Sequence, residues 1–296
     1  MDDMRLLVGI WYIIIALFLS PPYIRIVYIF LSKKKYRELE CYRIMTQIGL
    51  VQLTAAPTTF TLGLMQLLGT DPLGLANVFM TIFSACMSVE ILLSFALAIN
   101  RLKVIFEIEC LGVVTKASLQ DPRNWLYGLA YVIVVHTPFC GFYQLPGQYI
   151  GKYDFQKPYT WLLERIDGTL LLSCVLMTLL VYVMIIAYLF HLRRRSSSLN
   201  HIVKERPILV FACVHFCFDM TLQVAFFFGD FPPSDVTDLM VALIYFLNSL
   251  LTAPVLYLIL TRSLRNDFCK IFVKYLRGSA IGITIVPTSI PQATRS

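Results

Sequence analysis

The stretch Leu92–Phe106, LLSFALAINRLKVIF, is an apolar run that gives way abruptly to Asn100, Arg101 and Lys103. The rest of the chain repeats this contrast between long apolar blocks and short charged segments. Of the 296 residues, 58% are hydrophobic and only 15% are charged, whereas about a quarter are charged in an average soluble domain. A water-soluble core cannot hide that much apolar surface, so the composition predicts a membrane protein.

The apolar residues form seven blocks of roughly 20 residues, the helix length that crosses a hydrocarbon core. Their approximate bounds are Leu6–Leu31, Ile44–Leu68, Leu73–Ile99, Trp125–Leu145, Ile166–Leu192, Pro207–Gly229 and Val236–Leu260. Because unsatisfied backbone groups are costly in lipid, each block predicts a helix, and the alternating pattern of a membrane barrel is absent. The predicted fold is an all-α membrane protein, a seven-transmembrane helix bundle. It forms one domain over residues 1–277, and the tail at 278–296 lacks periodicity and is expected to be disordered.

Lys and Arg are distributed unevenly between the connecting segments. One set of alternate segments carries most of them, including Lys33–Lys35, Arg101 and Arg193–Arg195, and the other has only Arg5, Lys152, Lys157 and Arg165. By the positive-inside rule the first set is cytoplasmic, so the N-terminus is expected outside and the C-terminus inside. The net charge of +7 is then a signal of topology, and it requires no nucleic-acid partner.

Motifs of soluble enzymes are absent from the sequence. The cysteines form no C-x-x-C pair, the histidines form no H-E-x-x-H motif, and neither a Gly-rich phosphate loop nor a G-x-S-x-G elbow occurs. We therefore expect no enzyme, no metal and no cofactor. Two other classes remain as alternatives: a seven-helix ligand-gated channel, whose N-terminus would lie inside against the charge distribution, and a small-solute transporter, which would be expected to show internal repeats.

Polar residues within the apolar blocks are the candidates for internal sites. Counting back from Arg101 by helical turns gives Leu97, Ser94, Glu90, Met87 and Phe83, which share one face. A membrane-embedded carboxylate usually faces the protein interior, so this face is expected to point into the bundle. The alternatives are that Arg101 extends to lipid headgroups and that Glu90 is a protonated, hydrogen-bonded side chain. His215 and Asp219, one turn apart, form either an internal polar clamp or a ligand contact.

The seventh block contains Pro254 and Tyr257, where the proline is expected to kink the helix. Beyond it, Leu264–Leu276 alternates apolar and basic residues at helical spacing, which predicts a short amphipathic helix on the membrane surface. Cys269 on that helix is a candidate for palmitoylation. The RRRSSS stretch at 193–198 has the form that basophilic kinases favour, with Ser196–Ser198 as acceptors.

Together, Asn100-Arg101, Pro254-x-x-Tyr257 and the basic helix that follows resemble rhodopsin-like G-protein-coupled receptors. Within that superfamily, CYRIMTQIGL at Cys41–Leu50 and APVLYLILTRSLRND at Ala253–Asp267 look like the serpentine chemoreceptors of nematodes, most nearly class T. The resemblance implies a chemosensory receptor in the plasma membrane or the sensory cilium. Its implied partners are a small-molecule ligand, a heterotrimeric G protein and the lipid bilayer.

The resemblance also implies roles for single residues. Arg101 would meet the G protein, and Pro254 and Tyr257 would belong to the pivot and latch of the seventh helix. The chain departs from the pattern where Asn100 replaces an acid and Gln52 stands in the region of an expected aspartate. Because Asn100 cannot form an ion pair with Arg101, a weaker inactive state is expected.

The ligand site implied by the resemblance lies in the outer half of the bundle. Candidate wall residues are Phe79, Phe83, Met87, Phe226, Phe227 and Tyr245. This aromatic and Met-rich set suits a small, largely apolar molecule, although ordinary helix packing explains each residue equally well. Phe83 occupies the level at which amine receptors carry an acid, which disfavours an amine held at that position. The seventh block lacks a lysine, which excludes a retinal Schiff base there.

Overall fold

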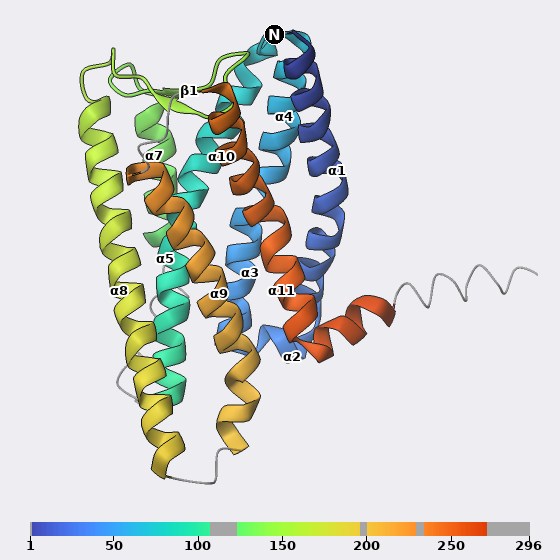
Figure 1. The fold of residues 1–296 in the computed structure, drawn as a ribbon, viewed down its shortest axis with the longest axis vertical. Helices are drawn as coiled ribbons and strands as arrows, with labels where there is room; N and C mark the ends of the chain where they lie inside the picture. Colours follow the sequence, from blue (N-terminus) through green and yellow to red (C-terminus); the bar gives the residue numbers. More distant parts are fainter. Residues whose placement is uncertain (1, 107–122, 196–199, 229–233, 271–296) are drawn as a thin grey trace, which may run out of the picture.

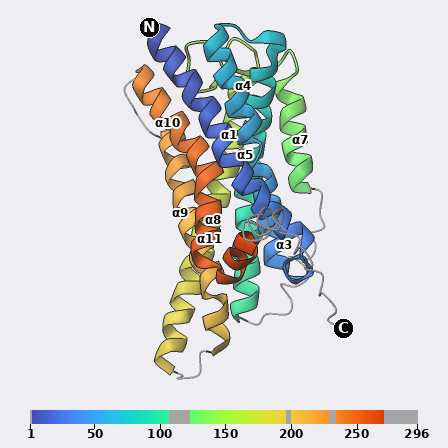
Figure 2. The same cartoon turned by 90° about the vertical axis from the view of Figure 1, so that its right-hand side faces the viewer.

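The computed structural model describes residues 2–106, 123–195, 200–228 and 234–270, and these form a bundle of long helices (Figure 1). The N-terminus and a small β-hairpin lie at one end of the bundle, which we call the hairpin end. The short helix α2 (Lys34–Arg37) and the helix at 262–270 lie at the opposite end. Figure 2 shows the same long axis from the side, with α1 (Asp2–Ser32) next to α10 (Asp235–Leu247) and α11 (Ala253–Leu260).

The second predicted helix is broken into α3 (Glu40–Gln52) and α4 (Ala55–Leu68). Leu53 and Thr54 separate them, and Pro57 is the cause, because it cannot donate to the carbonyl of Leu53 and its ring crowds that carbonyl. A short turn, η1 (Pro72–Gly74), then leads into the next helix.

The third helix, α5 (Leu75–Phe106), continues well beyond the predicted end at Ile99. Asn100 and Arg101 therefore lie inside a helix, followed by further helical residues. This is possible because Leu102, Ile105 and Phe106 continue the apolar face and pack against the core. The helix contacts α3, α4, α7 (Arg123–Val135), α8 (Thr160–Arg195) and α9 (Asn200–Phe228), which makes it the central element of the described fold.

The prediction of a fourth helix extending to Leu145 was wrong. The helix α7 ends at Val135, and Phe142–Tyr143 (β1) pairs antiparallel with Lys152–Tyr153 (β2). Pro138 and Gly141 follow the helix end, and both are poor helix residues. The apolar residues that the sequence pattern assigned to the membrane instead build the connection between α7 and α8.

The seventh helix consists of α10, a π-helical turn η2 (Asn248–Thr252) and α11. The wide turn ends two residues before Pro254, whose missing N–H leaves the carbonyl of Leu250 in this turn without its regular helical partner. Ser234 starts α10 by accepting a hydrogen bond from the backbone of Thr237 at 3.2 Å. After Thr261, residues 262–270 are helical, whereas the rest of the predicted segment Leu264–Leu276 lies outside the described residues.

Six helical segments of the described chain are long and apolar enough to cross a membrane, and Trp125–Val135 is a shorter apolar helix. Large apolar side chains are exposed on the outside, including Phe18 and Ile133, while Gln52, Glu90 and Arg101 are buried. This distribution suits a protein whose surroundings are apolar.

The first two helical spans pack closely through a pair of glycines. A Cβ atom added at Gly9 would lie 2.9 Å from the carbonyl oxygen of Gly63, and one added at Gly63 would lie 2.8 Å from that of Gly9. Small residues at such crossings let helix backbones approach, which is a common packing device in membranes. This contact joins α1 to α4 near the hairpin end.

Candidate functional site

A cavity of about 90 Å³ lies toward the hairpin end of the bundle, between α5, α8, α9, α10 and the connection that contains β1 and β2. Its walls are mostly aromatic and apolar, with a few polar groups. The lining residues are Met80, Phe83, Ser84, Met87, Ser88, Phe142, Tyr149, Ile150, Gly151, Tyr153, Asp167, Leu171, Gln223, Ala242, Tyr245 and Phe246. Such a concave, largely apolar site with few polar groups is typical of small-molecule binding.

Three of the predicted wall residues, Phe83, Met87 and Tyr245, line this cavity. Phe79 does not; it is half-buried on α5, and its carbonyl accepts a hydrogen bond from Thr58 at 3.0 Å. The side chains of Phe226 and Phe227 lie outside the described residues. Half of the six predicted wall residues therefore line one cavity of the described bundle, and whether a ligand binds there stays a prediction.

The most informative wall residue that the sequence analysis missed is Asp167, which is only 3% exposed. Its Oδ1 atom accepts hydrogen bonds from Tyr127 at 2.6 Å and from Ser88 at 3.2 Å. The signal was present in the sequence, because Asp167 is an acid inside an apolar block, as Glu90 is. The carboxylate connects α5, α7 and α8 at the edge of the cavity.

A second set of hydroxyl groups continues this polar edge. Tyr131 lies 3.3 Å from both Ser84 and Tyr153, through its hydroxyl oxygen. Burial, Tyr131 and the carboxylate of Asp167 raise the pKa of Tyr153, which therefore stays neutral. The tyrosines form a hydrogen-bonded wall without a formal charge, and Asp167 is the one acid that borders it among the lining residues.

The hairpin connection covers the cavity and is held without a disulfide among the described cysteines. The backbone of Gln144 donates to Asn77 Oδ1 at 2.7 Å, and Lys157 donates to the carbonyl of Cys140 at 2.6 Å. At Gly151, an added Cβ atom would lie 2.6 Å from Phe142 Cζ, so a larger residue there would require the aromatic ring to shift.

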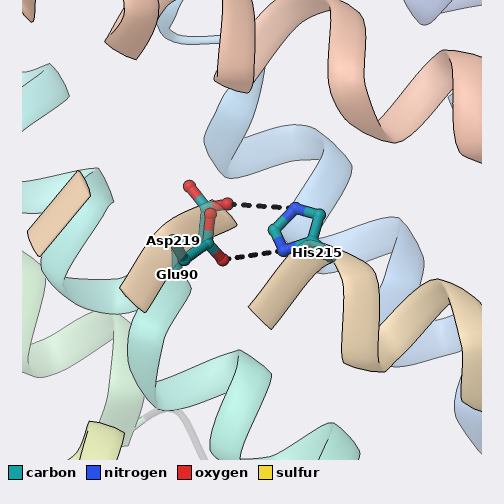
Figure 3. A group of neighbouring side chains, drawn as sticks. All are labelled: Glu90, His215 and Asp219. Carbon is teal, nitrogen blue, oxygen red and sulfur yellow. Dashed lines mark ion pairs between the residues drawn. The ribbon is translucent and has the colours of Figure 1, made fainter. Parts of the chain in front are cut away.

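A second buried cluster lies deeper in the bundle, where α5 meets α9 (Figure 3). His215 lies between two acids: its Nδ1 is 2.7 Å from Asp219 Oδ2, and its Nε2 is 3.5 Å from Glu90 Oε1. The predicted pairing of His215 with Asp219 is therefore present. All three side chains are buried, so the cluster is screened from solvent.

Neighbouring helices complete this cluster with neutral donors. Gln52 donates to Glu90 and lies 2.8 Å from His215 Nε2, and it accepts a hydrogen bond from Tyr23. Asn248 in η2 donates to Asp219 Oδ1 at 2.8 Å. A proton on His215 Nδ1 fits this arrangement, because Nδ1 faces Asp219 while Nε2 faces an amide donor. The cluster thus links α1, α3, α5, α9 and the seventh helix.

The same three residues could hold a metal ion. One ligand atom from each of Glu90, His215 and Asp219 lies within 4.8 Å of the others, and imidazole with carboxylates suits zinc. A zinc ion would require these atoms to move closer, because zinc–ligand bonds are about 2.0–2.2 Å long. The hydrogen bonds from Gln52 and Asn248 already bind the cluster together, so an internal polar clamp explains the arrangement as it stands.

Arg101 lies at the other end of α5 from the cavity and is only 2% exposed. Its Nη2 donates to Asn100 Oδ1 at 2.9 Å, and Asn100 Nδ2 in turn donates to Glu40 Oε2 at 3.0 Å. Lys103 also reaches Glu40, at 3.2 Å. This burial does not fit the alternative in which Arg101 extends to lipid headgroups. Glu40, which no motif of the sequence indicated, brings an acid close to Asn100 from another helix.

Pro254 and Tyr257 are both buried in α11. The ring of Tyr257 stacks on Phe211 of α9 at 4.4 Å and meets Phe30 of α1 edge-on at 5.3 Å. Its hydroxyl has no hydrogen-bond partner among the described residues. Tyr257 therefore packs between the first, sixth and seventh helical spans, with one polar atom available for another partner.

Cys269, the candidate for palmitoylation, is exposed on the helix at 262–270. The candidate phosphorylation sites Ser196–Ser198 lie outside the described residues. The structure therefore gives a setting for only one of these two predicted modifications.

No family model and no curated protein sequence matches the chain. Its structure is similar to the crystal structure of squid rhodopsin, with a TM-score of 0.67 and 12% sequence identity over 97% of this chain and 93% of that one. An identity this low shows a common fold only. The described helices thus have the arrangement of the rhodopsin fold, and the chain is a multi-pass membrane protein.

Proposed function

We propose that this chain is a G-protein-coupled chemosensory receptor of the plasma membrane. It binds a small, largely apolar molecule in the cavity at the hairpin end and activates a heterotrimeric G protein at the opposite end. The hairpin end is then outside, in agreement with the few Lys and Arg residues in its segments. The sequence resemblance to class T chemoreceptors of nematodes supports the sensory role and the sensory cilium as a location.

One observation carries the proposal: α5 carries both the cavity wall and the buried Arg101. Phe83 lines the cavity, and Arg101 lies 18 residues further along the same helix, about 27 Å away at the helical rise of 1.5 Å per residue. A single rigid element thus connects a ligand site to a buried cation at the other end. Together with the rhodopsin fold, this favours a receptor over an enzyme.

The buried cluster offers a connection between these two ends. Glu90 lies on α5 between Phe83 and Arg101, and it meets His215 of α9. A ligand that favours an altered packing of α5 against α9 would shift the populations of the two states by its difference in affinity. G-protein binding and ligand binding must then strengthen each other by the same factor.

The seventh helix argues against a retinal-binding photoreceptor. Residues Asp235–Leu260 contain no lysine, so no Schiff base can form there. The cavity of about 90 Å³ is also suited to a much smaller molecule.

The test is to express the chain in cells and apply a panel of small volatile molecules while recording G-protein activation and membrane conductance together. The variant Arg101→Ala is compared with Arg43→Ala, which removes an exposed arginine near the same end. We expect a G-protein response that Arg101→Ala abolishes and Arg43→Ala retains at equal surface expression. A conductance that persists in Arg101→Ala and under G-protein blockade would instead identify a ligand-gated channel.

A further inference from the structure

The cavity contains one acidic side chain and no basic one among its lining residues. Asp167 is 97% buried, and no cationic side chain of the described residues forms an ion pair with it. The two lysines of the hairpin connection are engaged elsewhere, because Lys152 pairs with Asp238 and Lys157 binds backbone carbonyls. Asp167 thus faces the cavity without a counter-ion.

The hydrogen bonds of Asp167 are those of an acceptor. Tyr127 and Ser88 both donate to Oδ1. An ionised carboxylate has about four acceptor sites, so these partners leave capacity for a further donor. They also hold the carboxylate in place, because Tyr127 belongs to α7 and Ser88 to α5.

The remaining wall suits a cation as well. Aromatic rings surround the cavity, among them Phe83, Phe142, Tyr245 and Phe246. The faces of aromatic rings attract cations, most strongly where water is excluded. Ionisable side chains inside membrane bundles mark functional sites, and serving as the counter-ion of a ligand is one of their roles.

We propose that the cavity binds a small organic cation, an alkylammonium ion whose N–H groups donate to Asp167 and whose alkyl carbons contact the aromatic wall. This inference rests on the proposed function and specifies its ligand class. Most of the ligand's surface is apolar, which matches the aromatic wall of the cavity, but the ligand carries one positive charge. The side chain that binds the ammonium group is Asp167 on α8, whereas Phe83 on α5 contributes only an apolar surface.

The volume of the cavity limits the size of the ligand. About 90 Å³ is smaller than the 150 Å³ cavity known to hold benzene. A primary amine with about four or five non-hydrogen atoms, such as isobutylamine, matches this space. At neutral pH such an amine is protonated, as the side chain of lysine is.

The experiment measures binding to the purified full chain in lipid nanodiscs by titration calorimetry. The probes are isobutylamine and its neutral isostere isobutanol, and the variants are Asp167→Asn and Glu164→Gln. Glu164 is an acid one turn earlier on the same helix that does not line this cavity, so its variant is the matched control. We expect isobutylamine to bind the wild type and Glu164→Gln alike, at least roughly tenfold more tightly than Asp167→Asn. Isobutanol should bind all three weakly and equally.

A purely structural role for Asp167 predicts a different result. Tyr127→Phe removes one of the hydrogen bonds that hold the carboxylate but leaves its charge in the cavity. We expect this variant to lose thermal stability and to keep isobutylamine affinity within about threefold of the wild type. If Asp167→Asn does not fold, the comparison of the amine with the alcohol on the wild type decides the question. Equal affinities for both probes, or full amine binding by Asp167→Asn, would overturn the proposal.

The same preparations separate this inference from the proposed function. G-protein activation by a neutral odorant, without any binding of isobutylamine, would overturn the ligand class and leave the receptor in place. Asp167-dependent binding of isobutylamine without nucleotide exchange on any Gα subunit would support the cation site and contradict the receptor function.

Discussion

Asn100 Nδ2 donates a hydrogen bond to Glu40 Oε2 across 3.0 Å and joins α5 to the first turn of α3. The same side chain accepts a hydrogen bond from Arg101 through its oxygen. An amide can do both at once, whereas a carboxylate can only accept. The asparagine therefore connects a buried arginine to an acid that lies 60 positions away in sequence.

This hydrogen bond predicts how basal signalling changes when the charge of Glu40 is removed. Glu40→Gln removes the charge that holds Asn100 and Lys103, so we expect basal nucleotide exchange on the G protein to rise severalfold. The assay uses purified chain in nanodiscs without ligand. Glu38→Gln, which alters an exposed acid that pairs with Lys34 among the described residues, is the control and should leave basal exchange unchanged. A Glu40→Gln variant with wild-type basal exchange would contradict the role given to this contact.

The buried cluster predicts a loss of stability when its histidine loses a partner. In Asp219→Leu the contact of His215 Nδ1 and the hydrogen bond from Asn248 are both lost. Leaving such polar groups buried without a partner costs about 3 kcal/mol. The midpoint of thermal unfolding in detergent should fall by roughly 6–12 °C. Cys217→Ala, on the exposed side of the same helix, should shift it little; an equal shift in both variants would argue against the clamp.

Asp267 predicts a specific pH dependence at the end of the seventh helix. Burial opposes its ionisation, but hydrogen bonds from Lys33, Lys35 and Tyr36 outweigh burial and hold its pKa well below the usual range. Because the folded pKa is depressed, this stabilisation is complete above the unfolded value of about 3.9 and is lost only as the pH falls toward the folded value.

Hydrogen exchange of residues 262–270 should therefore be protected equally at every pH above about 5. Asp267→Asn should remove this protection at neutral pH, because the lysines lose their charged partner, while Asn266→Ala on the exposed side should retain it. Since both lysines are partly exposed, high salt should weaken the effect. Unchanged protection in Asp267→Asn would show that apolar contacts of Leu264 alone dock this helix.

The glycine crossing of α1 and α4 predicts that even one methyl group destabilises the bundle. In Gly63→Ala the new Cβ would lie 2.8 Å from the carbonyl oxygen of Gly9, so the helices must separate. We expect a cost of about 1–3 kcal/mol and a lower thermal midpoint. Leu68→Ala, at an exposed position of α4, is the comparison and should cost less. If Gly63→Ala were as stable as the wild type, the close approach would not be essential.

The helical spans could be predicted where their position depends only on the length and spacing of the apolar residues within each segment. Apolar length alone predicts the membrane helices, and the helical period correctly placed Glu90 and Arg101 on the buried face of α5. The period also predicted the pairing of His215 with Asp219, because both lie one turn apart on one helix. The fourth span was mispredicted because apolar content cannot distinguish a membrane helix from an apolar connection that covers a cavity.

The candidate site was predictable only in part, since its residues come from distant parts of the chain. Phe83, Met87 and Tyr245 were found because the resemblance indicates which helix faces meet there. Tyr149 and Tyr153 were missed because their position depends on the hairpin connection folding over the cavity. Asp167 carried a usable signal, an acid within an apolar block, but its contacts with Tyr127 and Ser88 depend on how α5, α7 and α8 pack.

The sequence by itself determined that the chain spans a membrane several times and which face of α5 is buried, because segment length and helical period are local properties. The tertiary structure alone decided that Glu40 meets Asn100, that Gln52 joins Glu90 to His215, and that Asp167 faces the cavity. Each of these three features depends on residues of different helices. Their formation depends on how closely the helices approach and how each is rotated about its axis, which the period of a single helix does not determine.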